Sequence, residues 1–434
     1  MNIDKNRTIG ELVMKVIILS AATGGGHNTA ARALKEYIVN EDPNNEVEIV
    51  DFIEITSKIL SNVVTIGYKD LAMYAPSLFG YVYRQSDKKN TTASTTGINI
   101  IVKLTEDKVV ELIEQEKPDI IVSVHPFSTN LMSKIKTEGR VNVPVLAVIT
   151  DFTPHMAYIG ENINAYATGS YKTSDKLINK YGVNENIVYT TGLPILDKFH
   201  NYDEDKKSTT YEELGFSKDK PTLLIMAGSF GVRDILKIYE NISEIDLDFQ
   251  VIVITGKNKS LYEAFQKILD KDVTKFETYS LPKILQRIED SDFFRSLFIQ
   301  KGNYEKGKKE EYLKKKTSSK PTKLFYFVNN VEDYMHVSDV IITKPGGLTT
   351  SEAIACSLPM ALFDAIPGQE EANANYLCEK GMAIQLKKGT KGAKQIQYLF
   401  THKDKIDNMR QNCKANYMGN ACENLYTIVK KLIK

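Results

Sequence analysis

The sequence contains no tryptophan and only four cysteines, and each scarcity excludes a class of protein. Cys356, Cys378, Cys413 and Cys422 include no C-x-x-C pair, so neither a zinc ribbon nor a redox motif is predicted. Four thiols in 434 residues make no disulfide framework either, which favours a reducing cytoplasm. Without tryptophan, any contact with a membrane would depend on tyrosine, phenylalanine, methionine and basic side chains.

The chain also lacks an excess of charge of one sign and a long apolar run. Its 56 basic and 55 acidic residues give a net charge of +1, so no general basic field exists and no nucleic-acid partner is expected. No stretch reaches about 18 consecutive apolar residues, and residues 1–15 lack the apolar core of a secretory signal. We therefore expect a cytoplasmic protein that touches a membrane, if at all, only peripherally on its inner face.

Short β-branched apolar runs alternate with helical patterns along the chain. The first half has predicted strands at 15–21, 46–53, 119–126, 144–152, 165–168 and 187–194. The rhythm restarts with predicted strands at 221–231, 250–256, 323–328, 339–347 and 358–369. Strands that alternate with helices favour an α/β fold of two doubly wound parallel sheets.

Composition divides this pattern into domains. We predict an N-terminal domain over 1–200, a polar linker at 201–220 and a second domain over 221–416, interrupted by an insertion at 270–323. A last helix at 417–434 is placed to pack back on the first domain. Two stretches break the rhythm, namely the aromatic segment 59–103 and the insertion, whose residues 301–323 hold nine lysines against three glutamates.

The first motif with chemistry is the glycine run Gly24–Gly26 followed by His27, between a predicted strand and a helix. It is neither a P-loop nor a dinucleotide fingerprint, and the glycines alone would favour a tight turn. His27, however, lies at the carboxyl edge of a sheet, where ligands bind. A helix N-terminus favours neutral imidazole, so we predict a general base or an acceptor contact there.

More polar residues follow other strands of the first half. Asp151 and His155, in the motif TDFTPH, are predicted to form a substrate-facing pair. For His125, in SVHP, a role in the site and a role as a loop residue that caps backbone remain equally open. Because the chain has no helical H-x-x-x-H pair, no metal site is predicted.

The second half carries glycine-rich strand exits that suit a nucleotide sugar. In KPGGLTTSEA, glycines allow close backbone approach to a diphosphate, and Glu352 suits ribose hydroxyls. The alternative is a set of ordinary turns with capping threonines and acidic first-turn residues. The predicted donor-site residues are Gly228, Ser229, Phe230, Gly231, Arg233, Val328, Lys344, Gly346, Gly347, Thr349, Thr350, Glu352, Gln369, Glu370 and Asn373.

GGGH, TDFTPH, KPGGLTTSEA and PGQEEANA, in this order, resemble the motifs of plant monogalactosyldiacylglycerol synthases. The chain is even more similar to their bacterial relatives, the processive diacylglycerol β-glucosyltransferases, and more distantly to the glycosyltransferase that makes lipid II. The resemblance implies a GT-B fold, in which two Rossmann-like domains face a cleft. It also implies an inverting hexosyltransferase without a required metal or other cofactor.

By this resemblance the C-terminal domain holds a UDP-sugar and the N-terminal domain receives diacylglycerol. His27, Asp151 and His155 then fall at the acceptor side and the catalytic cleft, Gly346 and Gly347 at the diphosphate. Glu352 falls at the ribose, and Gln369 and Glu370 fall at the donor sugar. The insertion at 270–323 has no evident counterpart in the family.

Several functions and two membrane contacts stay open at this point. The alternatives to a glucosyltransferase are a lipid II-type N-acetylglucosaminyltransferase, a UDP-sugar epimerase of the same fold and a non-catalytic UDP-sugar sensor. An anionic membrane surface is predicted to meet Tyr68–Lys89 or the lysines of 301–323. The alternatives to these contacts are a buried helix and a solvated loop.

Overall fold

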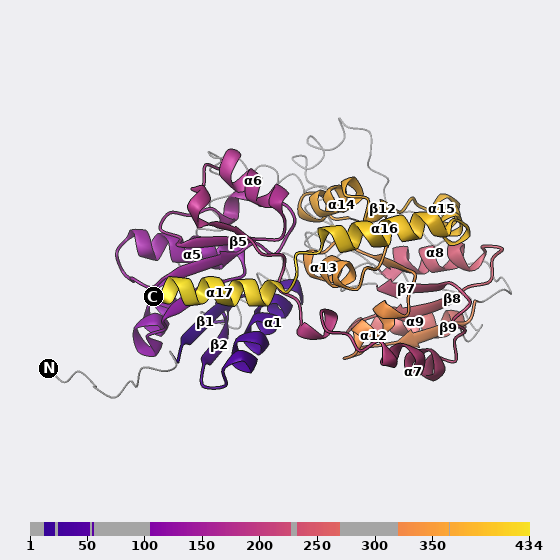
Figure 1. The fold of residues 1–434 in the computed structure, drawn as a ribbon, viewed down its shortest axis with the longest axis horizontal. Coiled ribbons are helices and arrows are strands. Elements are labelled where there is room, and N and C mark those ends of the chain that lie inside the picture. Colours follow the sequence, from indigo (N-terminus) through magenta and orange to yellow (C-terminus); the bar gives the residue numbers. More distant parts are fainter. Residues whose placement is uncertain are drawn as a thin grey trace, which may run out of the picture.

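The computed structural model describes residues 13–21, 25–52, 54–55, 105–226, 232–269, 320–363 and 365–434. They form two α/β domains side by side, each built on a six-stranded sheet with helices on its faces (Figure 1). All strand pairs are parallel. The predicted architecture of two doubly wound parallel sheets is therefore confirmed.

The N-terminal sheet has the strand order β2-β1-β3-β4-β5-β6. Its strands are β1 Lys15–Ser20, β2 Glu46–Asp51, β3 Ile120–Ser123, β4 Val145–Val148, β5 Ala165–Thr168 and β6 Val188–Thr190. The central strands β3, β4 and β5 are buried at every residue, as expected where helices cover both faces. The helices are α1 Gly25–Glu41, residues 105–116, α5 Pro126–Thr137, α6 Tyr171–Asn179 and the short turns η1 Met156–Tyr158, η2 Glu185–Ile187 and η3 Asp197–Phe199.

The C-terminal sheet has the order β12-β11-β10-β7-β8-β9. Its strands are β7 Thr222–Met226, β8 Gln250–Ile254, β9 Thr322–Phe325, β10 Val340–Thr343, β11 Met360–Leu362 and β12 Ala383–Gln385. Its helices are α7 Asp205–Leu214, α8 Val232–Ser243, α9 Lys259–Leu269, α12 Val331–His336, α13 Gly347–Ala355, α14 Gln369–Glu379, α15 Thr390–Thr401 and α16 Lys403–Asn416. Strand β12 was not predicted, because its three residues end in an exposed glutamine and form no apolar run.

Each sheet reverses its winding once, between β1 and β3 in the first domain and between β7 and β10 in the second. Ligands of doubly wound sheets bind at the carboxyl ends of the strands beside such a reversal. The strands at these points lead into GGGH and SVHP in the first domain, and into AGSFG and KPGG in the second. The topology therefore collects the predicted motifs at two ligand-binding edges.

The polar segment predicted as a linker at 201–220 is only partly a connection. Helix α7 occupies Asp205–Leu214, and its Tyr211 and Leu214 are buried in the core of the second domain. The Tyr211 hydroxyl also donates a hydrogen bond to the Val337 carbonyl, with a distance of 2.9 Å. A helix that buries one narrow stripe reads as polar, which is why its composition suggested a linker.

The last helix, α17 (Ala421–Ile433), lies on the N-terminal domain although it follows the C-terminal one (Figure 1). Its buried Leu425, Tyr426 and Val429 belong to the same apolar cluster as Val16 and Ile18 of β1. The chain thus crosses between the domains a second time, immediately before this helix.

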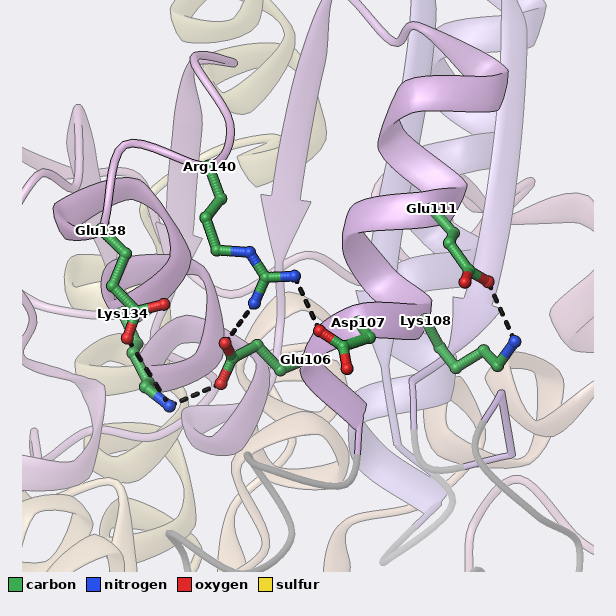
Figure 2. Close-up of polar contacts among 7 residues, drawn as sticks. All are labelled: Glu106, Asp107, Lys108, Glu111, Lys134, Glu138 and Arg140. Carbon is green, nitrogen blue, oxygen red and sulfur yellow. Dashed lines mark hydrogen bonds and ion pairs between the residues drawn. The ribbon is translucent and has the colours of Figure 1, made fainter.

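Figure 2 shows an ion-pair network that ties the helix of residues 105–116 to the end of α5. Glu106 pairs with both Lys134 and Arg140, and its side chain is only 12% exposed. Arg140 also pairs with Asp107, at 2.7 Å, but that carboxylate is 81% exposed. The sheltered pairs of Glu106 therefore contribute more to holding this helix than the solvated pair of Asp107.

Candidate active site at the domain boundary

His27 lies in the first turn of α1, directly beyond β1. Its Nδ1 lies 2.8 Å from the Val124 carbonyl oxygen and 3.1 Å from the Thr150 hydroxyl. Since a carbonyl can only accept, Nδ1 carries the proton of the neutral ring, and Nε2 is left as the proton acceptor. Burial lowers the pKa of His27 to about 4 against the raising effect of the Val124 hydrogen bond. The predicted neutral imidazole is therefore explained by burial.

His125 caps backbone, which is one of the two roles that the sequence left open, and its role in the site stays a prediction. Its Nδ1 accepts the Phe127 backbone N–H at 3.2 Å, which caps helix α5. Its ring also packs against His27, with ring centroids 4.5 Å apart. Burial, together with the neighbouring His27, holds the pKa of His125 well below its usual range. It is thus a capping residue that packs beside His27.

His155 is buried and caps the short turn η1, because its Nδ1 accepts the Ala157 N–H at 3.0 Å. That turn brings in Tyr158, whose hydroxyl lies 3.1 Å from the Thr150 hydroxyl. The TDFTPH motif therefore supplies a turn that links back to the His27 contact through Thr150. A direct catalytic role of His155 stays a prediction.

Asp151 is reached by side chains of the other domain. Its Oδ1 accepts a hydrogen bond from Asn373 Nδ2 at 2.9 Å, and its Oδ2 accepts one from Gln369 Nε2. The carboxyl is buried, and burial raises its pKa to about 6 despite the two amide donors. One predicted acceptor-side residue and two predicted donor-side residues therefore meet in a single polar cluster.

The two glycines of KPGG have different surroundings. A Cβ on Gly347 would lie 2.1 Å from the Thr150 carbonyl oxygen, whereas a Cβ on Gly346 would meet nothing within 4 Å. Gly347 therefore permits contact between the domains, and Gly346 borders open space at the N-terminus of α13. The Thr350 hydroxyl donates to the Gly346 carbonyl at 2.7 Å, so it bonds within its own helix.

Glu352 is 8% exposed, on α13. Burial raises its pKa to about 8, opposed by Lys198 and Arg32 and reinforced by Glu332. The carboxyl is accordingly protonated at neutral pH, so it offers a donor as well as an acceptor. Such a group suits vicinal hydroxyls, in keeping with the predicted ribose contact.

The remaining predicted donor residues are distributed as follows. Glu370 Oε2 accepts the Ile366 N–H at 2.8 Å and so braces the turn before α14. Val328, Lys344 and Thr349 are partly buried at the ends of β9 and β10 and in α13. Gly228, Ser229, Phe230 and Gly231 lie outside the described residues, and so does the side chain of Arg233.

Comparison with known proteins finds relatives of both halves of the chain. Residues 27–195 match the monogalactosyldiacylglycerol (MGDG) synthase family, and residues 278–430 match the glycosyltransferase family 28 C-terminal domain. The processive diacylglycerol β-glucosyltransferase of Bacillus subtilis (strain 168) is 26% identical over 410 residues, which cover 94% of this chain and 93% of that protein.

The chain therefore resembles the MGDG synthase family over its first half and glycosyltransferase family 28 over its second. Two solved structures show that its fold is GT-B. Acinetobacter baumannii MurG has a TM-score of 0.55 at 14% identity, covering 96% of this chain and 99% of its own. The S. aureus MnaA–UDP co-structure has a TM-score of 0.56 at 15% identity and covers 96% of each chain.

Sequence reasoning missed several residues of the candidate site. Thr150 contacts His27 through its hydroxyl and Gly347 through its carbonyl. Phe152 stacks on Tyr376 across the domain boundary, with ring centroids 5.0 Å apart. Each contact joins residues more than a hundred positions apart, so no local sequence pattern predicts it.

Among the described residues, no group of three His, Cys, Asp or Glu side chains is arranged to hold a metal ion. In the same part of the chain, every helix is too short or too polar to cross a bilayer.

Proposed function

We propose that this chain is an inverting glycosyltransferase that moves a hexose, specifically glucose, from a UDP-sugar to the hydroxyl of 1,2-diacylglycerol. The observation that carries the proposal is the cluster in which Asp151 of one domain binds Gln369 and Asn373 of the other. It brings the two predicted ligand-binding edges together, where a donor and an acceptor would have to meet. The match of residues 27–195 to the MGDG synthase family and the name of the Bacillus subtilis relative support diacylglycerol as the acceptor.

The donor would bind to the second domain. The N-terminus of α13 beside Gly346 would receive the diphosphate, since free N–H groups and the helix dipole favour anions. The buried Glu352 carboxyl would bind the ribose hydroxyls. Gln369 would bind the sugar, in exchange for its present contact with Asp151.

The reaction would be a single in-line displacement. His27 Nε2 takes the proton from the diacylglycerol hydroxyl as that oxygen bonds to the anomeric carbon of the sugar. The bond from this carbon to the UDP oxygen breaks, and the electron pair leaves with UDP. The growing charge on the diphosphate is stabilised by the N-terminus of α13 and by Lys344, without a metal ion. Asp151 is the alternative base.

The pKa of His27 does not prevent this role. At about 4 it keeps the imidazole neutral at physiological pH, so the acceptor lone pair is always present. A bound diphosphate brings negative charge into the cleft, which favours the imidazolium and strengthens the base as the reaction proceeds.

The acceptor lives in a bilayer, so the protein would work as a peripheral enzyme on an anionic membrane surface. Tyr68–Lys89 and residues 301–319 of the lysine-rich segment both lie outside the described residues. Deleting 301–319, which spares strand β9, and sedimenting the protein with anionic vesicles tests the second segment. Unchanged sedimentation would exclude these lysines as the docking element.

The decisive experiment incubates the purified chain with diacylglycerol vesicles and, separately, UDP-glucose, UDP-galactose and UDP-GlcNAc, and identifies the lipid products by mass spectrometry. We expect glucosyl-diacylglycerol. Transfer of GlcNAc to lipid II precursors alone would instead indicate the lipid II-type enzyme. Isomerised UDP-GlcNAc without lipid would indicate an epimerase, and UDP-sugar binding without any product would indicate a sensor.

A further inference from the structure

One stripe of helix α14 spans the boundary between the domains. Gln369, Asn373, Tyr376 and Glu379 follow one another at helical spacing and all contact the N-terminal domain. Gln369 and Asn373 bind Asp151, Tyr376 stacks on Phe152, and Glu379 pairs with Lys172 of α6. Gln369 and Asn373 are both expected at the donor sugar, yet in this structure both bind Asp151 of the other domain.

Asn373 is the centre of this stripe. Its Nδ2 donates to Asp151 Oδ1 at 2.9 Å and to the Pro345 carbonyl at 3.1 Å, and its Oδ1 accepts the Phe152 N–H at 3.0 Å. The residue is fully buried, with 0% exposure. Both amide protons are therefore committed to protein groups, and the sugar contact expected of Asn373 would require breaking one of these bonds.

The three partners of Asn373 belong to both halves of the site. Asp151 and Phe152 follow β4 in the acceptor domain, and Pro345 precedes α13 in the donor domain. The backbone of Thr150 meets Gly347 in the same place, so closely that no side chain would fit between them. The KPGG turn and the Asp151 loop are thus packed together around a single amide side chain.

We propose that Asn373 is a positioning residue: it orients the Asp151 carboxylate and locks the KPGG turn against it, so that Asp151 is in place only when the two domains are closed. This inference rests on the proposed function for its catalytic consequence, but the lock itself is independent of any reaction. Closure of the domains around the donor and correct placement of Asp151 would then occur together. This coupling would limit hydrolysis of the UDP-sugar by water.

The test compares Asn373→Ala with the unaltered chain by turnover, by UDP binding and by hydrogen exchange of the Phe152 amide, which reports the bond to Asn373 directly. We expect kcat to fall by about 10²-fold, as for misplaced catalytic groups, with the Kd for UDP changed less than about threefold. Exchange at Phe152 should accelerate. In an Asp151→Ala background, adding Asn373→Ala should cost no further turnover, because the two residues act as a unit.

Asn412→Ala is the matched control, since it also removes one amide bond to a backbone carbonyl, that of Gly381 at 3.1 Å, but within the second domain. It should leave kcat and Phe152 exchange unchanged. A raised KM for UDP-sugar with normal kcat would make Asn373 a sugar ligand and overturn the proposal, as would unchanged Phe152 exchange or additive losses with Asp151→Ala. If the unaltered chain transfers no sugar, the proposed function fails, while Phe152 exchange still decides whether Asn373 locks the domains.

Discussion

Three buried titratable side chains of the candidate site, His27, Asp151 and Glu352, have pKa values shifted toward their uncharged forms. The pKa of His27 is lowered to about 4, and those of Asp151 and Glu352 are raised to about 6 and about 8. Burial is the largest cause in each case, because a low-dielectric surrounding penalises charge of either sign. Near neutral pH, His27 and Glu352 are therefore mostly uncharged, whereas Asp151 is mostly ionised.

The role of His27 is tested by His27→Ala. We expect kcat to fall by about 10²- to 10⁴-fold, the usual contribution of a general base, while UDP binding stays the same because His27 belongs to the other domain. His402→Ala, which removes an exposed histidine of the second domain, is the control and should retain full turnover. Near-normal turnover of purified His27→Ala would reject the assignment.

Asp151 should impose an acid limit on activity. Because its pKa is raised to about 6, the Asp151 carboxylate gains a proton as the pH falls below this value. The protonated oxygen then becomes a donor and no longer accepts a hydrogen bond from an amide N–H. We expect kcat/KM to decline below about pH 6 and to be level above it. A profile from pH 5 to 8 for the unaltered chain and Asp151→Asn checks this. The same decline in the variant would assign the limit to another group.

Glu352 should make stability fall as the pH rises. Between the ordinary value of 4.5 and the folded value of about 8, the folded chain binds more protons than the unfolded chain, so the free energy of unfolding decreases with pH in this window. Glu352→Gln should remove on the order of a few kcal/mol of this dependence and weaken UDP binding. Thermal unfolding at pH 5 and pH 8, with a UDP titration, measures both. Equal pH dependence in both proteins would contradict the buried carboxyl.

At the scale of elements, the site is made by strand ends and by the first turns of helices. The strands around each winding reversal are buried on both faces, so they hold these turns rigidly at the edge of the sheet. Helix α13 shows how tightly they are placed, because its first residue touches the backbone of the other domain.

The neighbouring glycines of α13 provide a matched pair of substitutions. Gly347→Ala would drive a Cβ into the Thr150 carbonyl, 2.1 Å away, so we expect the domains to open and turnover to fall by at least about 10²-fold. Gly346→Ala has space for its methyl group and should keep the domains closed, with an effect confined to UDP binding. Small-angle X-ray scattering compares the two shapes. A closed Gly347→Ala protein would refute the contact.

At the scale of the whole molecule, the chain crosses between its two domains twice. The first crossing passes from β6 through η3 to α7, and the second passes from α16 to α17. The crossings touch each other, since Asn420 Nδ2 donates to Asp197 Oδ1 at 3.4 Å and Cys422 Sγ lies 3.6 Å from the Ile195 carbonyl. Movement of the domains would therefore turn about this double connection.

Helix α17 should contribute its stability to the domain at the other end of the sequence. Leu425 is fully buried in the N-terminal core, so Leu425→Ala should cost about 2–5 kcal/mol and raise hydrogen exchange in β1 and α1. Leu399→Ala, which truncates a buried leucine of the second core, should raise exchange in α8 and β8 instead. Faster exchange in the second domain of Leu425→Ala would contradict the packing.

Much of the fold was readable from the sequence because its signals are local. Buried parallel strands need continuous apolar runs, and each of the eleven predicted runs overlaps an observed strand, as in 165–168 for β5. The failures came where few residues are buried: β12 is too short to form a run, and α7 buries only one stripe.

By itself, the sequence determined the two-domain α/β fold, the resemblance to a known family and the sheet edges at which the motifs lie, because periodicity and glycine-rich strand exits are properties of neighbouring residues. Tertiary structure alone decided which residues meet across the boundary. That Gly347 contacts Thr150, that Asn373 holds Asp151 and that burial makes His27 neutral all depend on distant segments packing together. Burial and cross-domain hydrogen bonds are set by the environment of a side chain, and that environment exists only once the chain has folded.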